Sequence, residues 1–252
     1  MAELISYAPL GLIVLSAILL SAIAFWKRKS PVNVREIPAL TRLTRMLGLT
    51  IEEGSRLHIL LGHGGLLDAR GGSALAGLAM LRHIAERTSV SDKPVVASAG
   101  DPAIGLLTQD TIQSGYHAAG ADELYVPTTG RITGLSPFSY AAGAMHITQN
   151  ENVSANIMIG HFGAEAALIT ESSDRANVVV IGASDDLAGQ AVLFASAQDV
   201  LIGEELFAAG AYLGAGVSHR ASLTLQDVLR WLAVAALAGG SVLKVLQSLG
   251  VI

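Results

Sequence analysis

The first long apolar segment of the chain predicts a transmembrane helix. Residues 4–26 carry no charge, and about 20 apolar residues suffice to cross the hydrocarbon core of a bilayer. Aromatic rings lie near its ends, at Tyr7, Phe25 and Trp26, and the basic cluster Lys27–Lys29 follows directly. A cleaved signal peptide would instead carry its basic residues before the apolar run. Because positive residues favour the cytoplasmic side, we expect an inner-membrane protein with its N-terminus outside and its main domain in the cytoplasm.

Residues 31–55 predict an amphipathic collar that follows this anchor. Pro31 and Pro38 punctuate the segment. Its apolar residues recur at helical spacing and its basic residues lie between them: Ile37, Leu40, Leu43 and Leu47, with Arg35, Arg42 and Arg45. Two interpretations stay open, a helix packed on the domain or a helix lying on anionic lipid headgroups.

Between residues 56 and 225, short apolar runs alternate with helical patterns. The apolar runs are Leu57–Leu61, Pro94–Ala97, Glu123–Val126, Ala155–Ile159, Asn177–Ile181 and Val200–Gly203. The helical segments are Ser73–Arg87, Ala103–Ala119, Pro137–Gln149, Ala164–Ser172, Leu187–Ala197 and Glu204–Leu213. Most of the runs lack strict polar alternation, which is typical of strands buried on both faces of a parallel sheet. We therefore predict an α/β fold, a Rossmann-like domain with a doubly wound and mainly parallel sheet.

The two halves of this domain resemble each other. Gly62-His63-Gly64-Gly65 follows the first predicted strand and Gly160-His161-Phe162-Gly163 follows the fourth, so both turns match G-H-x-G. Weaker matches follow in the same order, an acidic residue before a helix (Asp101, Asp185) and an aromatic-Ala-Ala-Gly-Ala run at residues 140–144 and 207–211. This predicts two duplicated β-α-β-α-β halves, with coincidence in an Ala- and Gly-rich chain as the alternative. In the strand order 3-2-1-4-5-6, both turns would meet at the ligand crevice.

The end of the chain, residues 226–252, is hydrophobic. Trp231–Leu243 carries no charge, and the apolar character continues to Ile252, interrupted by Lys244 and Gln247. The uncharged part alone is too short to span a bilayer, at about 1.5 Å per residue. Extended to Ile252 it is long enough if Lys244 reaches the interface or faces a partner. We favour a membrane-associated helix, which leaves a single-pass and a double-pass topology open.

Composition narrows the possible functions. Hydrophobic residues make up 51% of the 252 residues and charged residues 15%, against the usual charged share of about 25%. The net charge is -5 without a long basic run, which argues against a nucleic-acid partner. The absence of cysteine excludes disulfides, thiolate metal sites and cysteine nucleophiles.

The candidate ligand site combines the two turns with the two acidic residues. Its members are Gly62, His63, Gly64, Gly65, Asp101, Gly160, His161, Phe162, Gly163 and Asp185. Glycines let the backbone approach a phosphate, and the following helices offer their N-terminal NH groups. The turns are neither G-x-G-x-x-G nor a P-loop motif, so no cofactor can be named from them.

Other chemistry has weaker support. His63-Gly64-Gly65 resembles an oxyanion element, but the G-x-S-x-G elbow is missing, and Ser98 and Ser184 are poor substitutes. The two histidines with Asp101 and Asp185 could converge on a metal ion, but they come from separate loops, so we assign no metal site and no catalytic residue. Asp101 and the pair Asp185-Asp186 have a structural explanation as helix N-caps. We expect the turns to be structural, with each histidine bonded to local backbone or to the opposite turn.

The chain also resembles a family of uncharacterised bacterial membrane proteins known only as a domain of unknown function. The resemblance rests on the N-terminal apolar segment, the G-H-x-G turns and the Ala-Ser-x-x-Asp-like segments at residues 97–101 and 183–186. It implies no activity.

Two hypotheses about function remain. The first is a membrane-anchored, scaffold-type protein without catalytic activity, whose partners are the lipid bilayer and copies of itself. It is favoured because no catalytic motif is complete and because the Gly- and Ala-rich helices can pack closely. The second is a domain that binds a small ligand or anion, or acts as an enzyme, at the G-H-x-G crevice.

Overall fold

Six parallel strands form one sheet at the centre of residues 35–215, in the order β3-β2-β1-β4-β5-β6. Their bounds are β1 (Arg56–Gly62), β2 (Val96–Ala99), β3 (Gly130–Ile132), β4 (Val153–His161), β5 (Val179–Ser184) and β6 (Asp199–Leu201). The computed structural model describes residues 2–26, 36–68, 70–212 and 216–249. The predicted α/β class and parallel sheet are confirmed, as is the neighbourhood of the first and fourth strands.

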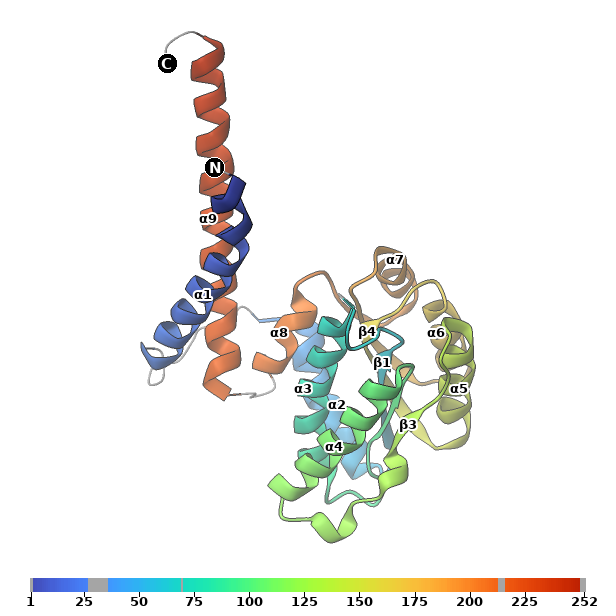
Figure 1. The fold of residues 1–252 in the computed structure, drawn as a ribbon. Coiled ribbons are helices and arrows are strands. Elements are labelled where there is room, and N and C mark those ends of the chain that lie inside the picture. Colours follow the sequence, from blue (N-terminus) through green and yellow to red (C-terminus); the bar gives the residue numbers. More distant parts are fainter. Residues whose placement is uncertain (1, 27–35, 69, 213–215, 250–252) are drawn as a thin grey trace. The chain divides into compact units, whose positions relative to one another are not determined.

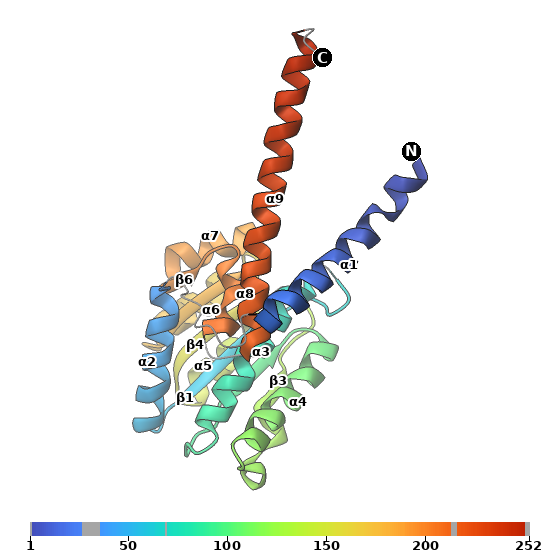
Figure 2. The same cartoon turned by 90° about the vertical axis from the view of Figure 1, so that its left-hand side faces the viewer.

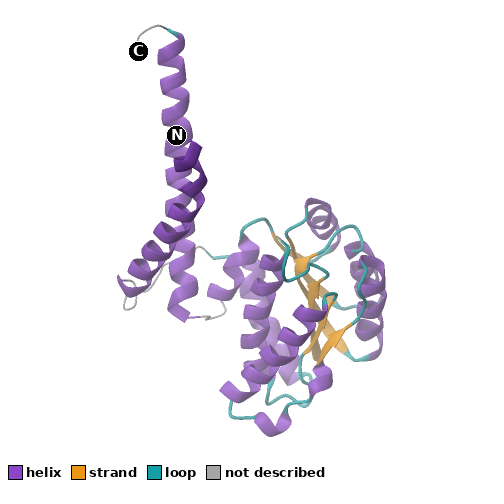
Figure 3. Cartoon of the chain, in the orientation of Figure 1, coloured by secondary structure: helices purple, strands orange, loops and turns teal. Residues whose placement is uncertain are grey.

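Helices cover both faces of the sheet (Figures 1 and 3). One face carries α2 (Pro38–Glu52), α3 (Gly71–Thr88), α4 (Pro102–Ala118) and α8 (Glu205–Tyr212). The other carries α5 (Pro137–Asn150), α6 (Ala166–Arg175) and α7 (Leu187–Ser196). The β1 residues Leu57, Ile59 and Leu61 pack toward the first layer and Leu60 toward the second. This alternation places a hydrophobic core on each side of the sheet.

The predicted collar belongs to this fold. Leu40, Leu43 and Leu47 of α2 are buried in the core of the first layer, so the interpretation of a helix packed on the domain is confirmed. Arg42 forms an ion pair of 3.0 Å with Asp199 of β6, and α2 runs beside that edge of the sheet (Figure 2). The compact unit that holds the sheet therefore includes α2, and the predicted domain bounds of 56–225 stay a prediction.

The third strand was predicted in the wrong place. Glu123–Val126 is not a strand: two short 3-10 helices, Asp122–Leu124 and Pro127–Thr129, occupy this part of the chain, and β3 follows them. Val126 is 45% exposed, and Pro127, which lacks a backbone NH, begins the second 3-10 helix directly after it. The pairing with β2 is made instead by Gly130, Arg131 and Ile132, and a Cβ added at Gly130 would meet Gln109 of α4.

The structure offers no support for a duplication. His63 bonds Glu165, whereas its counterpart His161 bonds Asp185. Tyr140 is buried, whereas its counterpart Phe207 is 41% exposed. The halves share a topology, but their matched residues have different surroundings, so the duplication stays a prediction.

The second compact unit comprises Met1–Val34 and Gly216–Ile252 and contains α1 (Ala2–Trp26) and α9 (Gly216–Ser248), which contact each other. Among the described residues, Ala221–Ser248 is the one helical segment long and apolar enough to cross a membrane. In α1 the corresponding apolar stretch, Ile13–Phe25, is shorter. The predicted N-terminal span therefore stays a prediction, and its basic flank Lys27–Lys29, like Pro31 and Arg35, lies outside the described residues.

Candidate functional site at the carboxyl edge of the sheet

The two G-H-x-G turns lie side by side at the carboxyl ends of β1 and β4. The two strands pair in parallel, with Gly62 opposite His161. After β1 the chain enters α3 on one face, and after β4 it enters α6 on the other. The turns thus flank the point where the strand connections diverge, the usual ligand position in such sheets. Their predicted meeting at the centre of the sheet is confirmed.

Glycine is required where the turns touch. A Cβ added at Gly160 would overlap the backbone carbonyl of Leu61, and one added at Gly62 would overlap the backbone of His161. Gly62 also has a φ of 72°, in the left-handed region that side chains rarely adopt. Close backbone approach therefore accounts for these two glycines without any ligand.

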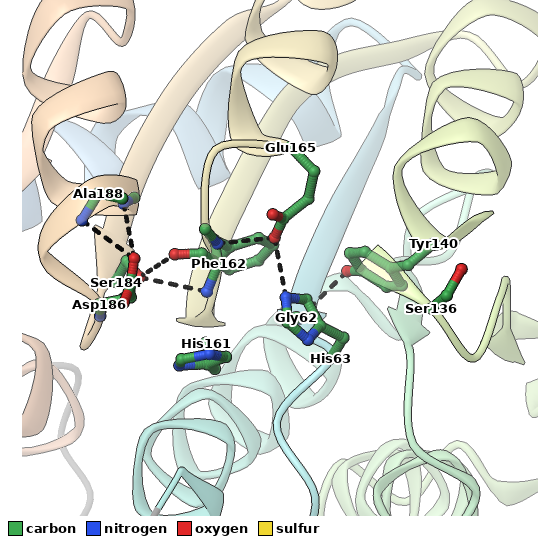
Figure 4. Close-up of polar contacts among 12 residues, drawn as sticks. Gly62, His63, Ser136, Tyr140, His161, Phe162, Glu165, Ser184, Asp186 and Ala188 are labelled. Carbon is green, nitrogen blue, oxygen red and sulfur yellow. Dashed lines mark hydrogen bonds and ion pairs between the residues drawn. The ribbon is translucent and has the colours of Figure 1, made fainter. Parts of the chain in front are cut away.

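His63 is held by a buried carboxylate from the opposite turn (Figure 4). Its Nε2 lies 2.9 Å from Oε1 of Glu165, and the same oxygen accepts the backbone NH of Gly163 at 2.7 Å. Burial by itself would raise the pKa of Glu165, but the hydrogen bonds from His63 and from the backbone outweigh it, so this pKa lies below its usual value. Glu165 is therefore an anion at neutral pH, and the facing Nε2 of His63 carries a proton.

His161 has a carboxylate partner of its own. Its Nδ1 lies 2.7 Å from Oδ1 of Asp185. The rings of His63 and His161 meet edge to face, with centroids 5.0 Å apart and planes at 79°. Since the carboxylates accept from Nε2 of His63 and Nδ1 of His161, Nδ1 of His63 and Nε2 of His161 are the unprotonated nitrogens in the neutral rings. Within the part of the chain that the structure describes, neither of these two nitrogens forms a hydrogen bond.

Four backbone NH groups of the turns are engaged inside the protein. The NH of Gly62 donates to Oη of Tyr140 at 3.2 Å and that of His63 to the carbonyl of His161 at 3.1 Å. The NH of Phe162 donates to Oγ of Ser184 at 3.2 Å, and Gly163 donates to Glu165. A phosphate cradle needs such donors free. These four NH groups are therefore not available to an anion.

A buried polar network supports the turns from below. Oη of Tyr140 lies 3.2 Å from Oγ of Ser98, which lies 2.8 Å from Nε2 of His58. Nδ1 of His58 lies 3.1 Å from Oδ1 of Asn156. Burial lowers the pKa of His58 to about 3, so this ring is neutral.

One direction of donation satisfies this whole network. Because the side-chain carbonyl of Asn156 only accepts, Nδ1 of His58 must donate to it, and Nε2 then accepts from Ser98. The Ser98 hydroxyl in turn accepts from Tyr140. At the other end, the amide of Asn156 donates to Thr148 of α5 and Ser173 of α6. The network therefore ties three strands to two helices and positions the Gly62 turn.

Comparison with known protein families places the chain in a family but assigns it no activity. A family model described as a domain of unknown function, DUF6754, matches residues 5–251. The chain belongs to this family. No curated protein and no solved structure matches it.

The acidic residues predicted for the site have different roles in the structure. Asp101 caps α4 by accepting the NH of Ile104 at 3.0 Å, as expected. Of the acidic pair before α7, only Asp186 is the N-cap, accepting from Ala188 and Gly189, while Asp185 bonds His161. No three His, Asp or Glu side chains among the described residues are grouped to hold a metal ion, so the four-ligand hypothesis gains no support.

Serine chemistry gains no support either. Ser98 does contact a histidine, but Ser98, His58 and Asn156 are all fully buried, where no substrate reaches them. Ser184 donates to the carbonyl of Phe162 instead of to a base. Neither Glu165 nor the His58 network was expected from the sequence. A clue to the network was present, because polar residues interrupt two of the apolar runs, at positions 58 and 156, and Ser98 directly follows a third.

Proposed function

We propose that this chain is a membrane-anchored protein that assembles with copies of itself. The observation that carries the proposal is α9. Its segment Ala221–Ser248 has 28 residues, or about 42 Å of helix, against the roughly 30 Å of hydrocarbon in a bilayer. Trp231 and Leu237 are each 73% exposed, and none of its most apolar window is buried. Such a surface is stable in lipid and unfavourable in water.

The proposal includes a membrane topology for the chain. We assign a second membrane segment to residues 4–26, with the N-terminus outside and the α/β domain in the cytoplasm. Support comes from the uncharged stretch, the basic residues after it and the helical conformation of α1, which contacts α9. Because the chain has no cysteine, single cysteines at Ala2 and at the exposed Gln113 of α4 report the sidedness. We expect an impermeant thiol reagent to label only the first in intact cells, and the reverse pattern would overturn the topology.

Assembly is assigned to the small-residue face of α9. Ala236 and Gly240 are four residues apart, and a side chain added at Gly239 or Gly240 would meet nothing within 4 Å. In membranes, small residues at this spacing let two helices approach closely. The open backbone surface of these glycines is therefore a contact face for a second copy.

Membrane extraction tests the anchor. Full-length protein and a variant lacking residues 1–30 should both stay in membranes washed at alkaline pH, because α9 holds each of them. A variant that also lacks residues 216–252 should be released. Release of the variant that lacks only residues 1–30, without detergent, would show that α9 does not enter the bilayer.

Cysteine crosslinking tests assembly. With no native cysteine, Gly240→Cys can form a disulfide only between copies. Ser241→Cys is the matched control, because it lies at nearly the same depth but about 100° around the helix. We expect oxidised dimers from the first variant and few from the second. Equal yields, or none, would contradict assembly through this face.

A second candidate function is ligand binding at the carboxyl edge. It is favoured by the two carboxylate-bound imidazoles, whose side chains are 12% and 11% exposed at the usual ligand position. Thermal-shift measurements with a panel of small molecules test it, using His63→Asn and His161→Asn as comparison variants. Stabilisation of the native chain that both variants lose is the expected result, and stabilisation that they keep would place the ligand elsewhere.

A further inference from the structure

We propose that helix α7 is the surface through which the α/β domains of two copies of this chain pair. The outward faces of the two α7 helices pack antiparallel, about a two-fold axis at Ala191. The inference rests on the self-assembly proposed above, but it concerns a surface of the α/β domain that is separate from the α9 face.

The outward face of α7, beside α6 in the second layer of helices, is apolar (Figure 1). Leu187 and Phe194 are 82% and 72% exposed. Together with the exposed Ala188, Ala191 and Ala195 they form the α7 stripe, which lies within about 120° of the helix circumference at 3.6 residues per turn. The ten residues of α7 include no Asp, Glu, Lys or Arg. An uncharged apolar surface with an exposed aromatic ring is typical of the core of a protein interface.

The α7 stripe is complementary to itself in an antiparallel pair. Reversal about Ala191 places Leu187 opposite Ala195 and Phe194 opposite Ala188. Each large side chain therefore meets a small one, and the small Ala191 at the axis lets the helices approach closely. A parallel pair would instead set leucine against leucine and phenylalanine against phenylalanine. Because a two-fold contact uses the same patch on both molecules, this size pattern indicates a second copy as the partner.

A groove beside the α7 stripe provides room for the partner's side chain. It lies between α6 and α7 with a volume of about 490 Å³, and Ala195 of the stripe lines it together with Ala167 and Thr170 of α6. In the antiparallel pair, Leu187 of the second copy lies opposite Ala195 and therefore at this groove. Side chains of one helix that fit into a groove of the next are the usual basis of helix packing.

Neighbouring charges argue against a lipid surface as the partner. Glu171 and Asp174 line the same groove, and Asp186 caps the start of α7. A helix that lies on a membrane typically carries Lys or Arg on its polar face, and α7 carries neither. A second copy needs no basic residues, because its contact with the α7 stripe is apolar.

Disulfide crosslinking of the full-length chain in isolated membranes tests the contact and its orientation. With no native cysteine, Ala191→Cys can form a disulfide only between copies, and its place at the axis should give abundant dimers. Gln190→Cys is the matched control, about 100° around the same helix, and should give few. Co-expressed Leu187→Cys and Ala195→Cys chains should form mixed dimers, whereas Leu187→Cys alone should form few. Dimers of Leu187→Cys alone, without mixed dimers, would overturn the antiparallel pair.

Phe194→Glu distinguishes this contact from the α9 contact. It places a carboxylate against Ala188 of the partner without a hydrogen-bond donor, so the Ala191→Cys dimer should be lost while the Gly240→Cys dimer persists. Circular dichroism should show an unchanged fold, because Phe194 is largely exposed.

No dimer from Ala191→Cys, or a dimer that Phe194→Glu retains, would overturn the α7 contact. Persistence of the Gly240→Cys dimer would then leave the α9 contact standing, and loss of both dimers would reject self-assembly. Protection of Ala191→Cys from a thiol reagent in membranes, without dimers, would overturn the proposal in favour of lipid.

Discussion

Strand β1 and helix α9 are both rich in large apolar residues, but they place them in opposite environments. In β1, Leu57, Ile59 and Leu61 are at most 1% exposed, whereas Leu237 and Leu243 of α9 are 73% and 55% exposed. Burial of apolar surface stabilises a protein by roughly 25 cal/mol per Å². The sheet obtains this stabilisation within the chain, and α9 must obtain it from lipid or from another helix.

The α/β domain also buries polar side chains, and it supplies their hydrogen-bond partners itself. His58 and Asn156 are fully buried beneath the turns, yet each has hydrogen-bond partners within the fold. A buried polar group is tolerated only when such partners exist. The contacts that stabilise the α/β domain thus lie within the domain, whereas apolar side chains of α9 such as Leu237 and Leu243 remain exposed.

The largest effect is expected from Gly160→Ala. The new methyl group overlaps the carbonyl of Leu61, and neither paired strand can move away, so we expect a loss of more than about 3 kcal/mol in unfolding free energy. Denaturant unfolding followed by circular dichroism measures it. Gly120→Ala is the control: its φ is 69° but nothing lies within 4 Å, so it should cost only about 1 kcal/mol.

Acid should destabilise the domain through His58. Its pKa is about 3 in the folded protein against 6.5 for a free histidine, so the folded state favours the neutral ring. The stability is fully present above pH 6.5 and is lost as the pH falls toward 3. Between pH 6.5 and 4.5 we expect a loss on the order of 2–3 kcal/mol, at about 1.4 kcal/mol per pH unit. Unfolding curves of His58→Gln across this range should lack that slope, and an unchanged slope would assign it to other groups.

Tyr140→Phe should have an intermediate effect. It leaves the NH of Gly62 and the hydroxyl of Ser98 without their buried partner, which we expect to cost about 1–3 kcal/mol. Tyr125→Phe is the comparison, because water can replace its partly exposed hydroxyl. A similar loss in both variants would show that the network under the turns has no special role.

The smallest effect is expected from His63→Asn. Asn keeps a donor and an acceptor, and Glu165 keeps the bond from the NH of Gly163, so the loss should be about 1 kcal/mol. Thermal unfolding measures it. A loss as large as that of Gly160→Ala would show that the histidine, and not only the glycine backbone, holds the turns together.

Much of the fold could be predicted from the order of apolar runs. The α/β class, the parallel sheet and the meeting of the turns follow from alternating strand and helix patterns. The third strand could not be placed, because Glu123–Val126 and Gly130–Ile132 are both short, and only pairing with β2 distinguishes them. At the site, the two histidines were predicted, whereas Glu165 was not, because an acid near a helix start has the same local pattern whether or not it binds a histidine.

The sequence by itself determined what depends on neighbours along the chain: the helices, the buried strands, the N-cap at Asp101 and the apolar character of α9. Tertiary structure alone decided which distant side chains meet. His63 and Glu165 are 102 residues apart, and His58 and Asn156 are 98 apart. Local periodicity reports which face of an element is apolar, but a hydrogen bond between two strands depends on their register. Sheet pairing therefore turned two isolated G-H-x-G turns into one pair of carboxylate-bound histidines.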